Sequence, residues 1–309
     1  MLSDQATSVP AATSSRPTTT DRVRQVVVTV SEVLCVYGTL VGVGVLGTSV
    51  ETSSGGALSA EATRIAPPGP AFSIWSVVYL GLFLYTIWQW LPSQATQRRM
   101  RSTGWLAAVS MLLNAGWLLV TQQGWIWVSV VVILALVLVL GELVRRLTAI
   151  PPTASPATSR GRRLAELVVV DGTFGLYLGW VAVATAANVT AALVSSGVRP
   201  SDAVSDLLAV VVIAVVALIS VVVSRAFGGR YAVAAASAWG LAWIAVGRTT
   251  SEPASTVTAV AAVLAALVVV AAALRFHRRA GTDGADGTDG TSASTGTTSG
   301  RVRGRTVTA

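Results

Sequence analysis

The sequence is short of the residues on which most enzyme sites depend. It has no lysine, one cysteine (Cys35) and one histidine (His277). A single cysteine excludes an internal disulfide and a CxxC metal site. A single histidine, placed in an arginine-rich stretch near the C-terminus, does not suit a Ser-His-Asp triad, an HExxH zinc site or a His-ligated haem. We therefore expect no required cofactor and no metal site, and an enzyme is the less favoured class.

Charge is also scarce. Charged residues make up 12% of the 309 residues and hydrophobic residues make up 53%, whereas a soluble domain carries about 25% charged residues. The net charge is +8, and all of the positively charged residues counted in it are arginines. A positive net charge can indicate a nucleic-acid partner, but the high apolar content favours a lipid environment, so we expect no nucleic-acid partner.

Eight stretches are apolar enough and long enough to cross a bilayer, which takes about 20 residues. They are residues 25–47, 70–91, 103–121, 124–144, 168–194, 204–224, 229–247 and 254–274. Backbone polar groups in lipid must pair within the segment, so each span is expected to be a helix. The predicted fold class is an all-α integral membrane protein with about eight transmembrane helices.

The arginines test this count. When the loops are assigned alternately to two sides, the side of both termini carries 19 arginines and the other side carries 3. Those three are Arg64, Arg199 and Arg248. Cytoplasmic loops of membrane proteins are enriched in arginine and lysine. The sequence thus predicts a multi-pass protein of the bacterial cytoplasmic membrane with both termini in the cytoplasm.

Two acidic residues fall inside predicted spans, Glu32 in the first and Asp171 in the fifth. Acidic residues within a membrane are costly, and they are usually paired or functional. Pairing with a nearby arginine is the default interpretation, and a proton or ion role is the alternative. Gly38 and Gly42 form a GxxxG pair, which is typical of close helix packing.

Aromatic and polar residues recur at helical spacing on three spans, so that each set lies on one face of its helix. The sets are Phe72, Trp75, Tyr79 and Phe83 on the second span, Ser110, Asn114, Trp117 and Thr121 on the third, and Tyr177, Trp180, Ala184 and Asn188 on the fifth. Directed inward, these faces would line a small-molecule pocket. Helix packing with Asn and Ser as interhelical hydrogen-bonding groups explains the pattern equally well.

At these residues the chain resembles the tryptophan-rich sensory protein family, TspO/MBR, also called the translocator protein or peripheral benzodiazepine receptor family. Residues 67–80, PPGPAFSIWSVVYL, are similar to the signature PPxWxFxxxWxxLYxxMG. Residues 113–117, LNAGW, are similar to LNxxW, and Tyr177-Leu178-Gly179-Trp180 followed by Ala184 and Asn188 is similar to YLxWxxFAxxLN. The resemblance covers roughly residues 25–195.

The resemblance implies a five-helix bundle with a cavity that binds porphyrins and other tetrapyrroles, sterols or aromatic drugs. Sensing, transport and light-dependent porphyrin breakdown are the activities proposed for the family. The ligand-binding residues expected here are Phe72, Trp75, Tyr79, Asn114, Trp117, Tyr177, Trp180, Ala184 and Asn188. The expected division is a disordered tail (1–24), the five-helix bundle (25–195), three additional transmembrane helices (196–275) and a disordered polar tail (276–309).

The chain departs from the family pattern at several positions. Pro70 stands where a tryptophan is expected, and Val183 and Ala187 replace a Phe and a Leu of the fifth-span motif. Loop 48–69 contains no aromatic residue, so a stacking lid over the cavity is in doubt. The last three spans resemble those of extended bacterial members, and their role does not follow from the sequence.

The favoured hypothesis is a membrane receptor or sensor that binds a planar aromatic or tetrapyrrole-type ligand between the second, third and fifth helices. One alternative is a small-molecule transporter with proton coupling through Glu32 or Asp171, and another is light-dependent porphyrin degradation. The expected partners are the lipid bilayer and a small hydrophobic or aromatic ligand, with a homodimer left open.

Overall fold

The computed structural model describes residues 16–152 and 159–289, with side chains up to Arg279. Within these ranges the chain forms helices, turns and bends and no strand. The α-helices are α1 (Thr19–Gly42), α2 (Ile74–Trp88), α3 (Arg98–Gln122), α4 (Ile126–Ala149), α5 (Arg160–Glu166), α6 (Thr173–Ser195), α7 (Asp202–Ala226), α8 (Tyr231–Thr250) and α9 (Thr256–Asp289). Two 3-10 turns, η1 (Ser54–Gly56) and η2 (Gly69–Ser73), precede α2, and a π-helical segment, η3 (Leu167–Gly172), joins α5 to α6.

Each of the eight predicted spans falls on one long helical segment, because η2 continues into α2 and α5 continues through η3 into α6. Seven of these segments are long and apolar enough to cross a membrane. The eighth, α8, is not among them; it is rich in alanine and carries Arg248 near its end. The all-α membrane fold predicted from the sequence is confirmed.

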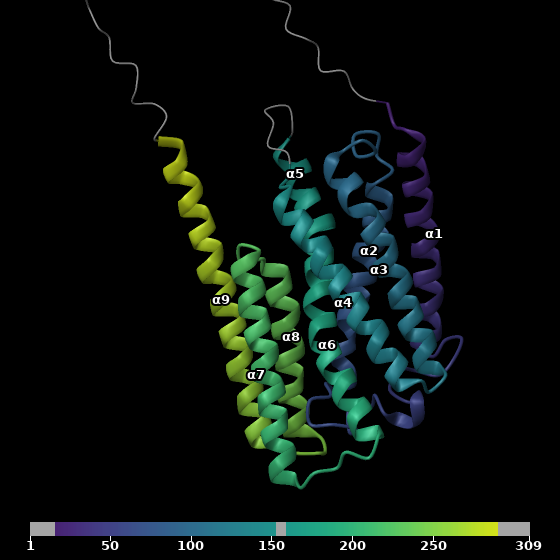
Figure 1. Cartoon of the computed structure of the whole chain (residues 1–309), viewed down its shortest axis with the longest axis vertical. Helices are drawn as coiled ribbons and strands as arrows, with labels where there is room; N and C mark the ends of the chain where they lie inside the picture. Colours follow the sequence, from purple (N-terminus) through teal and green to yellow (C-terminus); the bar gives the residue numbers. More distant parts are fainter. Residues whose placement is uncertain (1–15, 153–158, 290–309) are drawn as a thin grey trace, which may run out of the picture.

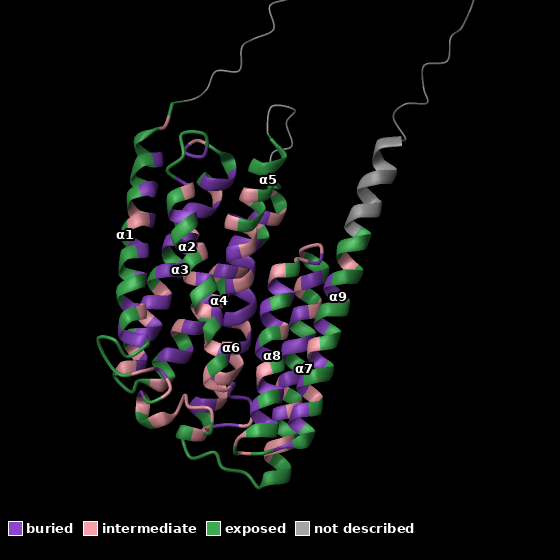
Figure 2. Cartoon of the chain, turned by 180° about the vertical axis from the view of Figure 1, so that it is seen from behind, coloured by how far each residue is buried: buried purple, intermediate pink, exposed green. Residues whose placement is uncertain are grey.

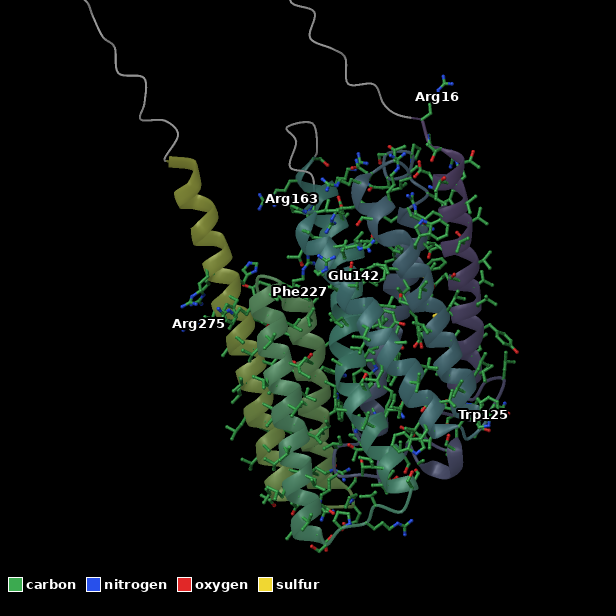
Figure 3. The ribbon with its side chains drawn as sticks, in the orientation of Figure 1. Arg16, Trp125, Glu142, Arg163, Phe227 and Arg275 are labelled. Carbon is green, nitrogen blue, oxygen red and sulfur yellow. The ribbon has the colours of Figure 1, made fainter. Side chains whose placement is uncertain are left out.

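The helices run side by side in alternating directions (Figure 1). The start of α1 and the end of α9 lie on the same side, which we call the terminal end, together with the connections 89–97 and 227–230, the end of α4 and the start of α5. The distal end holds segment 43–73 and the connections 123–125, 196–201 and 251–255. Arg16 and Arg163 lie toward the terminal end and Trp125 toward the distal end (Figure 3).

The outward faces of α1, α7 and α9 expose many large apolar side chains, as expected of surfaces in contact with lipid (Figure 2). Contiguous exposed apolar surface of this kind is unusual on a soluble monomer. Examples are Val26, Val33, Leu207, Leu218, Leu264 and Leu267. The bilayer is therefore a partner of this chain.

Helix α8 connects the bundle α1–α6 to α7 and α9. It packs against α6 on one side and α9 on the other, whereas α7 packs mainly on α9 and has little contact with α6. The approach of α8 to α6 depends on glycine, since a Cβ atom at Gly179 would lie 2.2 Å from the carbonyl oxygen of Val233. Close contact also explains the GxxxG pair of α1: a Cβ atom at Gly38 would lie 2.9 Å from the Cα atom of Ala115.

The helical segments extend further toward both ends of the chain than the predicted tails allow. Helix α1 begins at Thr19 because Thr18 and Asp21 form a capping box, in which each side chain hydrogen-bonds the backbone N–H of the other residue. Helix α9 continues through 276 to Asp289, and His277 packs against Tyr231 at the start of α8 with ring centroids 4.2 Å apart. Residues 19–24 and 276–289 are thus helical, and the remaining tail residues, 1–15 and 290–309, lie outside the described residues.

Candidate functional site

Aromatic residues from α2 and α6 meet around Trp75. The Trp75 ring stacks on Tyr79 at 5.2 Å and 13°, and it meets Tyr177 at 5.8 Å and Trp180 at 6.3 Å edge to face. Phe72 contacts Trp180 in the same way at 5.6 Å. Offset-stacked and edge-to-face pairs are the favoured geometries for aromatic rings. The predicted second-span and fifth-span residues therefore converge on one cluster inside the bundle, except for Phe83, whose side chain is exposed.

The two predicted asparagines differ in how fully they are engaged. Asn188 on α6 accepts a hydrogen bond from the Trp117 indole at 2.8 Å and donates one to Ser129 at 3.0 Å. Asn114 on α3 donates to the Tyr79 hydroxyl at 3.1 Å, but its buried Oδ1 atom accepts no hydrogen bond from the described residues. Asn188 thus ties α3, α4 and α6 together, whereas Asn114 leaves an acceptor for another group.

A cavity of about 250 Å³ lies beside this cluster, between α1, segment 49–51, α2 and α3. Two smaller cavities, of about 40 and 20 Å³, lie next to it, toward α4 and α6. Phe72 and Trp117 line all three, so these two side chains stand between the larger space and the smaller ones. Ligand pockets commonly measure roughly 300–1,000 Å³, and the large cavity lies just below that range.

The structure brings most of the predicted residues to these cavities. Phe72, Trp75, Tyr79 and Trp117 line the large cavity, and Asn114, Trp180, Ala184 and Asn188 line the smaller ones. Tyr177 lines none of the three; it is buried and its hydroxyl donates to the carbonyl oxygen of Ser110 at 3.1 Å. The contribution of α1, through Thr39, Gly42 and Val43, was not predicted, because no aromatic stripe marks that helix.

Segment 57–67 covers the inner cavity with aliphatic side chains. Ala57, Leu58, Ala66 and Pro67 line the cavity of about 40 Å³ from this side. The chain lacks the aromatic lid that the resemblance would imply, and small apolar residues close the cavity in its place.

Arg248 of α8 holds that segment. Its guanidinium donates to the carbonyl oxygens of Ala60 at 3.0 Å and Thr63 at 3.3 Å, and to that of Pro253 at 2.9 Å. The side chain is only 1% exposed, and it forms no ion pair with any described carboxylate. A buried charge without a counter-ion is costly, so the arginine is held there by the backbone carbonyls that it satisfies.

Two further contacts join the added helices to the cavity wall. The Trp239 indole of α8 donates to the carbonyl oxygen of Ala71 at 2.9 Å. Arg64 donates to Asp206 at 2.5 Å and to Asp202 at 3.0 Å, both on α7. Segment 57–71 is thus fixed by α7 and α8 together.

The two intramembrane acids have different surroundings. Asp171, in η3, accepts from Arg99 at 2.8 Å and from Arg230 at 2.5 Å, so its predicted pairing with arginine is confirmed. Glu32 on α1 is 4% exposed, and neither of its carboxylate oxygens has a hydrogen-bond partner among the described residues. The default interpretation therefore fits Asp171 and does not fit Glu32.

Comparison with known proteins gives one family. A family model described as TSPO-like protein matches residues 28–274. The match extends beyond the motif-bearing region at 25–195 and takes in α7, α8 and much of α9. No curated protein and no solved structure shows significant similarity to the chain.

Proposed function

The chain belongs to the TSPO-like family, and from this membership together with the aromatic cavity we propose that it is a membrane receptor or sensor for a planar aromatic ligand of the tetrapyrrole type. The observation that carries the proposal is the convergence of Phe72, Trp75, Trp117 and Trp180 on adjacent cavities inside a membrane bundle. Flat rings in an apolar, water-poor space favour a flat apolar ligand.

The residues define how such a ligand binds. The stacked pair Trp75 and Tyr79 presents ring surface to the large cavity. Asn114, with its unpaired Oδ1 atom, accepts a hydrogen bond from a ligand N–H or O–H group. A complete tetrapyrrole requires Phe72 and Trp117 to rotate, because these two side chains separate the large cavity from the smaller ones.

The test is a titration of the purified protein in neutral detergent with protoporphyrin IX, followed by porphyrin absorbance. Trp75→Leu keeps an apolar side chain and removes the flat surface, so we expect about tenfold weaker binding, equal to about 1.4 kcal/mol. Trp105→Leu is the matched control, since Trp105 lies on an exposed face of α3. Equal affinities for wild type and Trp75→Leu would contradict the cavity assignment.

Transport coupled to protons is a second candidate, favoured by the unpartnered carboxyl of Glu32. Glu32 lies one helical turn from Cys35, whose sulfur accepts a hydrogen bond from Asn114 at 3.5 Å. Asn114 in turn lines the cavity of about 20 Å³, so the Glu32 carboxyl lies near the wall of that cavity. In proteoliposomes this function predicts porphyrin uptake that depends on a pH gradient in wild type and is lost in Glu32→Gln. Uptake that ignores the gradient would remove this candidate.

We also propose that the chain lies in the bacterial cytoplasmic membrane with its terminal end in the cytoplasm. The terminal end carries most of the arginines, as the positive-inside rule requires. Cys35 is buried, so single cysteines can be introduced at exposed Ser93, at the terminal end, and at exposed Ser201, at the distal end. In intact cells a membrane-impermeant maleimide is expected to label Ser201→Cys and not Ser93→Cys; the reverse pattern would invert the orientation.

A further inference from the structure

Three arginines lie at the distal end, and two of them are engaged. Arg64 is held by Asp202 and Asp206, and Arg248 is buried among backbone carbonyls. Arg199, in the connection between α6 and α7, is exposed and has no hydrogen-bond or ion-pair partner among the described residues. Its charge is the one available at this end of the molecule for an anionic group from outside the chain.

Arg199 lines two cavities. One is an open cavity of about 490 Å³ between segment 54–57 and the end of α6. The other, of about 300 Å³, lies in the seam between α6 and α7. The two cavities share Ala62, Val194 and Arg199, so the guanidinium stands at their common boundary.

The open cavity also adjoins the aromatic site. It shares Ala57 and Ala191 with the inner cavity of about 40 Å³. That inner cavity in turn shares Phe72 and Trp117 with the large aromatic cavity. A row of adjacent spaces, separated by the side chains they share, therefore runs from the aromatic cluster, beneath segment 57–66, to Arg199.

The two ends of this row differ in charge. Glu51 lines the large cavity, where its carboxylate repels an anionic group. The described lining of the open cavity contains Arg199 and no acidic residue. Asp202 lines the seam cavity, and one oxygen of its exposed carboxylate accepts a hydrogen bond from Arg64. An aromatic ligand with an acidic substituent is thus favoured in one orientation, with the acid toward Arg199.

We propose that Arg199 binds the anionic group of the ligand, so that the ligand class is an amphipathic aromatic acid and not a neutral aromatic compound. The inference rests on the proposed function and specifies its substrate class. A guanidinium matches a carboxylate with two parallel hydrogen bonds, and such charge-assisted bonds are stronger than neutral ones. The aromatic residues then supply affinity, and Arg199 supplies orientation and selectivity.

The test compares protoporphyrin IX with its dimethyl ester, which has the same ring system and no carboxylate. Binding is measured in neutral detergent for wild type, Arg199→Gln and the control Arg225→Gln, an exposed arginine next to the terminal-end connection 227–230. Wild type is expected to prefer the diacid. Arg199→Gln is expected to weaken diacid binding about tenfold and to leave ester binding unchanged, while Arg225→Gln changes neither.

Each other outcome has a defined meaning. Equal binding of diacid and ester by wild type, or equal effects of Arg199→Gln on both, overturns this inference and leaves the aromatic site standing. If Arg199 instead binds a lipid headgroup, Arg199→Gln is expected to affect diacid and ester equally, because the detergent contains no anionic lipid. Wild-type protein that binds neither compound overturns the proposed function and this inference with it.

Discussion

The bundle α1–α6 and the helices α7–α9 bury different kinds of side chain. The bundle core contains Trp117, Tyr85, Tyr177 and Phe174 together with aliphatic residues. The buried cluster formed largely by α7, α8 and α9 contains no aromatic residue and is rich in alanine: Ala209, Ala217, Ala234, Ala245, Ala259, Ala262, Ala265 and Ala273. Rings line the cavities beside the bundle core, whereas alanine side chains let α7, α8 and α9 pack against one another.

This difference assigns separate tasks to the two regions. The bundle holds the aromatic cavities, whereas α7, α8 and α9 pack on one another largely through alanine, and the cavity of about 300 Å³ lies where α7 meets α6. Arg248 and Trp239 of α8 bind the segment that covers the cavity, and Asp202 and Asp206 of α7 bind Arg64 of the same segment. Helices α7 and α8 therefore act on the cavity by fixing segment 57–71, which covers it.

The strongest test of this comparison is Arg248→Met, which keeps an apolar stem and removes the donors to segment 60–63. Loss of hydrogen bonds from a charged donor corresponds to about 3 kcal/mol in total. Because the freed segment can move outward and regain water, we expect faster ligand release, by about a hundredfold, in place of unfolding. Stopped-flow dissociation of protoporphyrin IX measures it, with Arg225→Met as the control. An unchanged release rate would show that Arg248 of α8 does not keep the cavity closed.

A smaller effect is expected where α8 meets the bundle. In Gly179→Ala the new methyl group meets the backbone of Val233 at 2.2 Å, which forces α6 and α8 apart. Overpacking of this kind costs typically 1–3 kcal/mol, and we expect about 2 kcal/mol, seen as a lower Tm of the detergent-solubilised protein. Gly116→Ala is the matched control, since a Cβ atom there meets nothing within 4 Å. Equal Tm values for the two variants would show that the α6–α8 contact is not close.

The smallest effect is expected at the terminal-end connection between the two regions. Arg230 pairs with Asp171 and also donates to Thr148 at 2.9 Å. In Arg230→Gln, Asp171 keeps its hydrogen bonds to Arg99, so we expect the free energy of unfolding to fall by only about 1.5 kcal/mol, seen as a lower Tm, and the ligand release rate to stay unchanged. Faster release in this variant would show that the cover is controlled from the terminal end as well.

The sequence predicted the positions of the helices along the chain better than the contacts between helices. Hydropathy and arginine alternation located all eight helical segments, and residue spacing put Trp75 and Trp180 on the faces that meet. Spacing describes one helix at a time, however, and does not say which helix lies opposite. The α1 wall at Thr39 and Gly42 was missed for this reason, and so was the hydrogen bond that occupies Asn188 with Trp117.

The contacts that hold the segment covering the cavity could not be predicted from the sequence for a related reason. Segment 48–69 shows no aromatic motif, and the residue that holds it is a single arginine on a helix whose sequence reads as a plain membrane span. Arg248 and Ala60 are 188 positions apart. No local pattern can report a contact across such a separation, because its energy depends entirely on tertiary folding.

That separation also orders events during synthesis. Ribosomes add about 5–20 residues per second, so Arg248 is made roughly 10–40 s after its partner Ala60, 188 positions earlier. During this interval the aromatic bundle can be inserted and assembled, but its cover has no anchor on α8. A nascent chain arrested after α6 lacks every contact of segment 57–71 with α7 and α8, and these contacts form only as the two helices are completed.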